Sequence, residues 1–246
     1  IEKYSKLLSI IQDENFQSKK LLDIQKDLVS SNINCKNEMK KLKNIISWLG
    51  DSTSNAYYLL INVFFMSDIF ILSNLQEWRI TNGYKLEKWL EDMGEVEALV
   101  SLSTISFEHE EWTYPTISGI NEIEAIELAH PLLGERAKAN NFNLKGSEKV
   151  ALITGSNMSG KSTFLRTIGF NMVLTYLGLP TFSKGFKCGI SNIYTCMRTQ
   201  DNLDENISSF YAEILRIKLV IEAAKNGEKV FFLLDEIFKG TNSQDR

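Results

Sequence analysis

The sequence has few cysteines and histidines and no excess of positive charge. Its three cysteines, Cys35, Cys188 and Cys196, include no C-x-x-C pair, and its two histidines do not complete a zinc-binding pattern. This usage favours a reduced, cytoplasmic setting. The net charge of −4 over 246 residues argues against a surface that is basic throughout. Any contact with nucleic acid is therefore expected to be local.

The sequence also lacks an apolar run long enough to span a bilayer. Its most apolar segment, residues 57–72, is interrupted by Asn62, Ser67 and Asp68 and falls short of the ~20 residues that a spanning helix needs. We predict that this segment is a buried core helix. No membrane segment is expected.

The first hundred residues have helical periodicity. Apolar residues recur at mostly helical spacings from about residue 4 to 49, which predicts long amphipathic helices with a break near Ser30-Ser31-Asn32. The lysines alternate with Asp and Glu, so they are interpreted as a solvated face rather than a DNA site. Asn82-Gly83 predicts a turn, with a further helix after it. Residues 1–100 are therefore predicted to form a helical region.

Beyond about residue 100 the pattern changes to short segments rich in β-forming residues. Strands are predicted at 104–107, 112–117 and 123–128, separated by polar or glycine-containing turns. His130 precedes a proline, and it is either a ligand contact or part of a structural turn. Residues 101–246 are predicted to form a separate α/β domain.

The most informative stretch is residues 149–163. An apolar run at 149–154 is followed by G-x-x-x-x-G-K-S and then by a helical pattern, which is the strand, loop and helix order of a P-loop. Glycines allow such a loop to turn its N–H groups inward, and the positive end of the helix faces the same anion. The helix is expected to end at Leu177-Gly178-Leu179-Pro180. The pattern predicts a nucleotide-phosphate site formed by Gly155, Ser156, Asn157, Met158, Ser159, Gly160, Lys161, Ser162 and Thr163.

Within this site, Lys161 would add positive charge next to the phosphates, and the Ser162 hydroxyl would coordinate Mg²⁺. A second motif supports this interpretation over a chance match in a glycine-containing turn. Residues 230–234 form an apolar run that ends in Asp235 and Glu236, which predicts a parallel strand buried on both faces with its end at the ligand crevice. Asp235 would hold Mg²⁺, and Glu236 would orient or deprotonate the attacking water.

The loop T-G-S-N-M-S-G-K-S-T at 154–163 resembles that of the MutS family of DNA mismatch-repair ATPases, which usually reads T-G-P-N-M-G-G-K-S-T. Asn157 and Met158 are the distinctive residues, because generic P-loops do not require them. Further similarity lies at 129–132, 201–213 and 234–242, and residues 94–102 resemble the end of the family's lever helix. The resemblance implies an ABC-type P-loop NTPase domain, partial here, preceded by a helical lever.

The family resemblance also implies cofactors and partners. These are ATP or ADP with Mg²⁺, a second copy of the protein when complete, and double-stranded DNA, mismatched or branched, held by a clamp that ATP controls. Ser208 would act on the phosphate bound by the second copy, and an ordinary helix cap is its alternative role. Ser156, Ser159 and Ile207 depart from the family pattern and indicate a divergent branch. No Phe-x-Glu occurs, so the mismatch-reading wedge of the family is absent from this chain.

The chain begins at Ile1 and ends at Arg246, before the family's switch histidine and dimerising helices. It is expected to be a piece of a longer protein with weak or no hydrolysis of its own. Another ABC-type ATPase is an alternative, although the L-S-G-G-Q signature expected of one does not occur. A nucleotide-gated scaffold is the other alternative, against which Lys161, Asp235 and Glu236 argue for the full-length protein.

Overall fold

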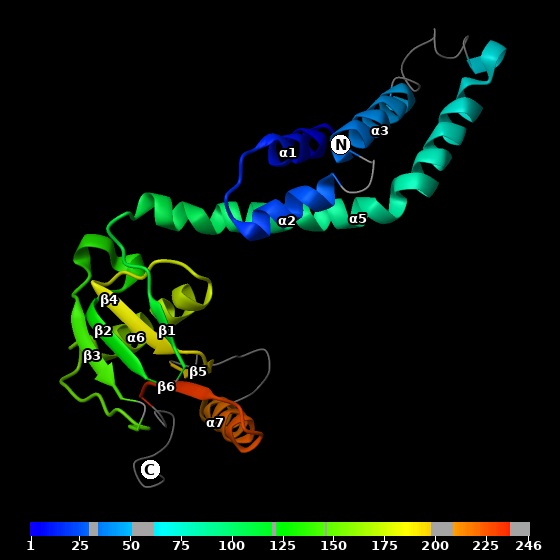
Figure 1. Cartoon of the computed structure of the whole chain (residues 1–246). Helices are drawn as coiled ribbons and strands as arrows, with labels where there is room; N and C mark the ends of the chain where they lie inside the picture. Colours follow the sequence, from blue (N-terminus) through cyan, green and yellow to red (C-terminus); the bar gives the residue numbers. More distant parts are fainter. Residues whose placement is uncertain (30–33, 51–61, 120–121, 146, 198–208, 237–246) are drawn as a thin grey trace. The chain divides into compact units, whose positions relative to one another are not determined.

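The computed structural model describes residues 1–29, 34–50, 62–119, 122–145, 147–197 and 209–236 (Figure 1). Its chain divides into two compact units, Ile1–Leu102 and Ser103–Arg246. The long helix α5 (Ser67–Glu108) begins in the first unit and ends six residues into the second. The two units are described separately below.

The first unit is helical, as its periodicity predicts. It contains α1 (Glu2–Asp13), α2 (Lys19–Leu28), α3 (Cys35–Gly50) and most of α5, with α1 packed beside α3 and α2 lying along α5 (Figure 1). The buried side chains of all four helices form one core: Leu8, Ile11, Ile24, Leu28, Cys35, Met39, Leu42, Trp78, Trp89, Met93 and Val96. The predicted break at 30–32 falls between α2 and α3, in residues that are not described. A second break, between α1 and α2, was not predicted.

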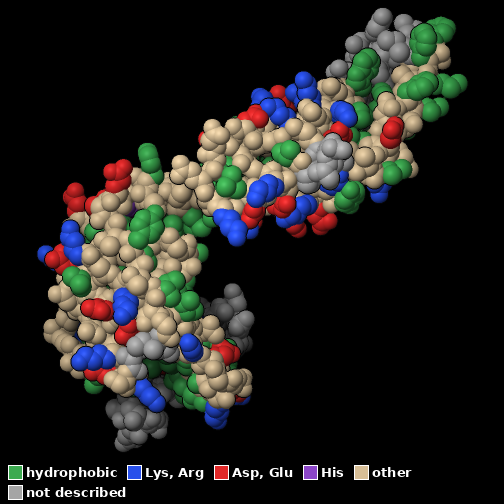
Figure 2. All heavy atoms as spheres, viewed as in Figure 1, with side chains coloured by type: hydrophobic (Ala, Val, Ile, Leu, Met, Phe, Trp, Pro, Cys, Tyr) green, Lys and Arg blue, Asp and Glu red, His purple; other side chains and the backbone are tan. Residues whose placement is uncertain are grey.

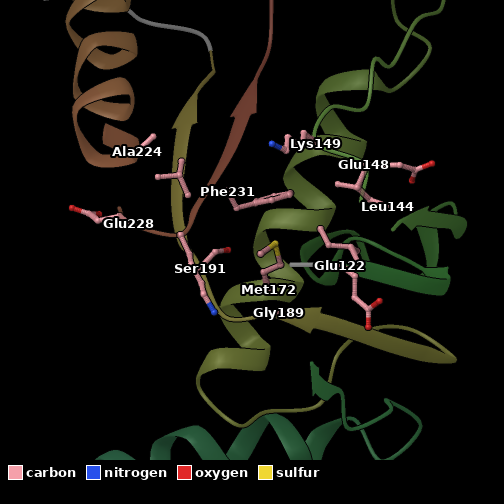
Figure 3. Close-up of a pocket in the computed structure, with 13 residues that line it drawn as sticks. Glu122, Leu144, Glu148, Lys149, Met172, Gly189, Ser191, Ala224, Glu228 and Phe231 are labelled. Carbon is pink, nitrogen blue, oxygen red and sulfur yellow. The ribbon is translucent and has the colours of Figure 1, made fainter. Parts of the chain in front are cut away.

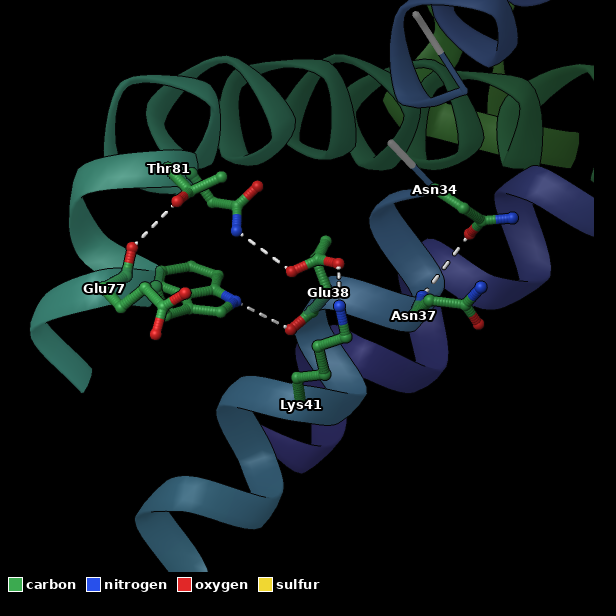
Figure 4. Close-up of polar contacts among 8 residues, drawn as sticks. Asn34, Asn37, Glu38, Lys41, Glu77 and Thr81 are labelled. Atoms are coloured by element: carbon green, nitrogen blue, oxygen red, sulfur yellow. Dashed lines mark hydrogen bonds and ion pairs between the residues drawn. The ribbon is translucent and has the colours of Figure 1, made fainter. Parts of the chain in front are cut away.

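The turn predicted at Asn82-Gly83 is wrong, because both residues lie inside α5. Asn82 is only 1% exposed, and its amide donates to Glu38 Oε2 of α3 at 3.0 Å (Figure 4). Thr81 Oγ1 also donates to the carbonyl of Glu77 at 2.9 Å, a back-bond that commonly bends helices. Figures 1 and 4 show that α5 changes direction near this point. The Asn82-Gly83 dipeptide locally favours a turn, but the hydrogen bond to the distant Glu38 keeps it helical.

The prediction of a buried helix at 57–72 is also wrong for the described part of that segment. Seven large apolar side chains are more than half exposed: Val63, Phe64, Phe65, Met66, Ile69, Phe70 and Leu72. Figure 2 shows hydrophobic side chains gathered at this end of the first unit. Among residues 62–72, only Ile71 is buried. Among the described residues, no helix is long and apolar enough to cross a membrane.

The second unit has a mixed α/β fold with a four-stranded sheet. The sheet order is β1 (Thr116–Ser118), β4 (Gly185–Gly189), β2 (Ile123–Leu128) and β3 (Asn140–Leu144). β1 runs parallel to β4, whereas β2 runs antiparallel to both β4 and β3. The 3-10 helix η2 (Pro131–Arg136) joins β2 to β3. The strand predicted at 123–128 is confirmed, the one at 112–117 is reduced to β1, and residues 104–107 instead continue α5.

A second, two-stranded sheet pairs β5 (Asn192–Cys196) with β6 (Val230–Leu234) in parallel. Helix α6 (Lys161–Tyr176) contributes to the core of this unit, and α7 (Ser209–Lys225) packs on β5 and β6. The predicted strand and its parallel pairing are confirmed for β6. Burial on both faces is not, because only Leu233 of β6 is buried.

The strand predicted at 149–154 does not form. This segment has no strand partner among the described residues, and Val150 and Leu152 are 83% and 86% exposed. A β-strand requires a neighbouring strand to receive its backbone hydrogen bonds. The prediction of a strand before the loop, which was based on apolar composition alone, was therefore wrong.

Candidate functional site

The glycine-rich loop leads into the N-terminus of α6 as predicted. Gly160 is the N-cap with φ +91°, a left-handed conformation that favours glycine. The helix begins at Lys161 and ends at Tyr176, with Gly178 at φ +73° just beyond it. Both glycine signals in the sequence therefore mark the helix ends correctly, and the first turn of α6 directs unpaired N–H groups at the loop.

Lys161 folds back over the loop that precedes it. Its Nζ donates to the carbonyl of Gly155 at 2.8 Å and to the carbonyl of Ser156 at 2.7 Å. The backbone N–H of Ser159 also donates to the Ser156 carbonyl, at 3.3 Å. The loop is therefore curled around the ammonium group, which carries positive charge where the motif predicts a phosphate.

A side chain at Gly155 would crowd the neighbouring loop side chains. A Cβ atom at this position would lie 2.9 Å from Ser159 Oγ and 3.9 Å from Lys161 Cδ. Met158 has φ +64° and is fully exposed, so the crest of the loop carries a non-glycine residue in the left-handed region. Asn157 is exposed beside it. The predicted loop residues thus lie together just before the first turn of α6, with Asn157 and Met158 exposed.

The acidic end of β6 lies toward the same end of α6. Phe231 of β6 and Met172 of α6 project into one cavity (Figure 3). Two residues further along β6, Leu233 lies close to Gly169 of α6, because a Cβ on Gly169 would be 2.8 Å from Leu233 Cδ1. Moving along β6 toward Asp235 therefore means moving along α6 toward Lys161. Parallel β5 and β6 bring Asp235 next to Cys196, whose carbonyl accepts from the Asp235 N–H at 3.0 Å.

Asp235 has the features of an ion ligand. It is 8% exposed, and its Oδ2 is buried without a hydrogen-bond partner in the described part of the chain. A buried carboxylate oxygen is unfavourable unless a cation or donor satisfies it. Carboxylate and hydroxyl oxygens are the ligands that Mg²⁺ prefers, so Asp235 and Ser162 fit that ion. Glu236 follows at φ +47°, outside the strand conformation.

Some predicted site residues lie outside the described residues. These are Ser208 and the segments 201–208 and 237–242 that carry part of the family resemblance. Thr163 lies in the first turn of α6, where its carbonyl accepts from Thr167 Oγ1 at 2.8 Å. Within the described ranges, no group of three or more His, Cys, Asp or Glu side chains could hold a metal ion by itself.

His130 has a structural role in this unit. Its Nδ1 accepts from the backbone N–H of Leu132 at 3.3 Å and so caps η2. Burial, and secondarily the nearby charge of Arg166, lower the pKa of His130, so the neutral, accepting imidazole is favoured. The sequence left two roles for His130, a ligand contact or part of a structural turn, and the structural turn accounts for these contacts.

Asn171 is a residue whose importance sequence reasoning missed. It is fully buried, and its amide donates to the carbonyls of Ala129 and Thr167 at 3.1 and 2.8 Å. Its Oδ1 accepts from the N–H of Phe182 at 3.1 Å. The signal was a polar residue among the apolar positions of a helix. Its bonds to Ala129 and Phe182 fix α6, and with it the loop, against the segments next to the larger sheet, whereas the bond to Thr167 lies within α6.

A cavity of about 500 Å³ lies between α6 and the β5–β6 pair (Figure 3). Its lining combines apolar side chains with the charged residues Glu122, Glu148, Lys149, Glu228 and Lys229. Glu228 accepts from Asn192 and Tyr194, and Glu122 pairs with Lys187 at 2.5 Å. Two of its carboxylates therefore already have partners, and the cavity presents both apolar and charged groups.

The second unit is thus a mixed α/β fold in which a lysine-bearing glycine loop and an acidic strand end occur toward one end of the same helix. The model for MutS domain V matches residues 151–246. Residues 151–246 are therefore a MutS-family segment.

Curated relatives agree with this assignment. The chain is 32% identical over 165 residues to the DNA mismatch repair protein MutS of Persephonella marina, and 33% identical over 168 residues to that of Bacillus subtilis. Each alignment covers 65% of this chain and 19% of the relative. Endonuclease MutS2 of Carboxydothermus hydrogenoformans is 27% identical over 178 residues, covering 71% of this chain and 22% of the relative. The chain thus spans about a fifth of the length of the relatives it matches.

Proposed function

We propose that the second unit binds ATP and ADP with Mg²⁺ and is the ATPase region of a MutS-like protein that acts in DNA mismatch repair or on another DNA structure. The observation that carries the proposal is Lys161, whose ammonium group sits in the curl of the loop on the carbonyls of Gly155 and Ser156. A phosphate chain would draw Nζ from these neutral acceptors to its own charged oxygens. The relatives named for DNA mismatch repair support the DNA partner.

In the complete protein, the proposed reaction is in-line attack of water on the γ-phosphate. Lys161 and the N–H groups at the start of α6 hold the phosphates, and Glu236 positions the water. Ser162 and Asp235 hold Mg²⁺, which when bound neutralises phosphate charge. Ser208 from a second copy completes the site, so that closing of a homodimer on ATP is coupled to a DNA clamp.

Calorimetric titration of the 246-residue chain with Mg-ATP and Mg-ADP tests this proposal. We expect Lys161→Ala to weaken binding more than about a hundredfold, because a charge-assisted contact to phosphate is lost together with the shape of the loop. Lys225→Ala is the matched control, since Lys225 is an exposed lysine in the last turn of α7. Equal affinity of the Lys161→Ala chain and the parent would contradict the site assignment.

A further inference from the structure

Ser159 stands where the family loop usually has glycine, so the loop of this chain carries an additional hydroxyl. The Ser159 Oγ approaches Gly155 so closely that a Cβ there would lie 2.9 Å away. The same Cβ position is 3.9 Å from Lys161 Cδ. The hydroxyl and the Lys161 side chain therefore both lie on the side of Gly155 that a Cβ would occupy.

The hydroxyl has no structural use that would explain its position. The N-cap of α6 is Gly160, and α6 receives no hydrogen bond from a capping side chain. Ser159 contributes its backbone N–H to the loop, in the bond to the Ser156 carbonyl. Its Oγ makes no hydrogen bond to the described residues of the chain. The donor is thus available in the same loop whose carbonyls hold the Lys161 ammonium group.

We propose that the Ser159 hydroxyl donates a hydrogen bond directly to the phosphate chain of the bound nucleotide. This inference rests on the proposed function and adds a side-chain donor to a loop that otherwise binds phosphate through main-chain N–H groups and Lys161. Hydroxyl-to-phosphate bonds are charge-assisted and stronger than bonds between neutral groups. Ser159 is therefore a binding residue through its side chain as well as its backbone.

Calorimetry with Mg-ADP on variants of the 246-residue chain tests the proposal. Ser159→Ala removes the donor and should weaken binding about tenfold, equivalent to about 1.4 kcal/mol. Ser159→Thr keeps the hydroxyl and should stay within about threefold of the parent, which a purely steric role would not predict. Ser147→Ala removes an exposed hydroxyl in the turn before the loop and should leave affinity unchanged.

Two results would overturn the inference while leaving the proposed function in place: Ser159→Ala binding as tightly as the parent, or Ser159→Thr losing as much affinity as Ser159→Ala. In both cases Lys161→Ala would still weaken binding more than about a hundredfold. Failure of the parent itself to bind Mg-ADP or Mg-ATP would instead remove the proposed function and this inference with it. Equal unfolding temperatures of all variants without nucleotide ensure that affinity, and not folding, is compared.

Discussion

Three glycines of the second unit serve different physical needs. Gly160 adopts a left-handed conformation, whereas Gly155 and Gly169 leave room for close neighbours. At Gly169, α6 approaches β6 so closely that a Cβ would stand 2.8 Å from Leu233 Cδ1. That contact holds the loop-bearing helix against the acidic strand.

We therefore expect Gly169→Val to destabilise the second unit by about 1–3 kcal/mol through overpacking. Gly94→Ala is the control in an exposed part of α5, where a Cβ has nothing within 4 Å. It should stabilise the first unit by about 0.5–1 kcal/mol, because alanine favours helix. Chemical denaturation of both variants measures the difference. A neutral Gly169→Val would show that the two elements are not in close contact.

Cys35 is a buried thiol whose environment suppresses ionisation. Burial, and secondarily the charge of Asp92, raise the pKa of Cys35 to about 12. The native thiol should therefore resist alkylation at pH 8, where an unfolded chain reacts readily. Above about pH 9 the unfolded chain releases this proton and the folded chain retains it, so Cys35 makes stability fall as pH rises. Mass spectrometry of alkylated peptides measures the protection, and rapid labelling of Cys35 in the native chain would contradict it.

At the scale of elements, a small polar network fixes α3 against α5. The carbonyl of Glu38 accepts from Trp78 Nε1 at 3.0 Å, and its carboxylate accepts from Asn82 and pairs with Lys41 at 2.6 Å (Figure 4). These contacts occur where α5 bends. A buried polar pair of this kind is stabilising only while both partners are present.

Glu38→Ala and Asn82→Ala should each destabilise the first unit by about 1–3 kcal/mol, since each leaves buried polar atoms unpaired. A double-mutant cycle should give a coupling free energy of about 0.5–3 kcal/mol. The exposed pair of Lys36 and Asp13 is the matched control and should give about 0–1 kcal/mol. Additive effects at Glu38 and Asn82 would show that the two helices are not joined through this contact.

At the scale of the whole molecule, the described surface has a concentrated apolar end on the first unit. Phe64, Phe65 and Phe70 are 77%, 70% and 68% exposed. With about 150–250 Å² for each side chain, these three alone present on the order of 400 Å². A patch of that size is near the upper end for ordinary monomers and promotes association.

We expect the double substitution Phe64→Ser with Phe70→Ser to lower binding of an apolar dye and to raise the solubility limit of the chain. Its free energy of unfolding should change by less than about 1 kcal/mol, because exposed side chains contribute little to the core. Phe107→Ser, at an 80% exposed phenylalanine outside the patch, is the control and should change dye binding little. Strong destabilisation by the double substitution would show instead that these rings are buried.

The sequence by itself determined the features that depend on a few neighbouring residues. Gly160 and Gly178 mark the ends of α6 because left-handed backbone favours glycine, and the apolar run before Asp235 specifies a strand. The helical periodicity of the first unit is equally local. The chemistry predicted for Lys161 and Asp235 rests on residue type and spacing and stays a prediction, and Ser208 and its segment lie outside the described residues.

Only the tertiary structure decided features that require a distant partner. Residues 149–154 are apolar but form no strand, because no strand pairs with them in the described chain. Asn82 remains helical because Glu38, 44 residues away, accepts its hydrogen bond. The apolar segment 62–72 is exposed because no described element packs on it. Backbone preference acts within a few residues, whereas pairing and burial depend on which segments the fold brings together.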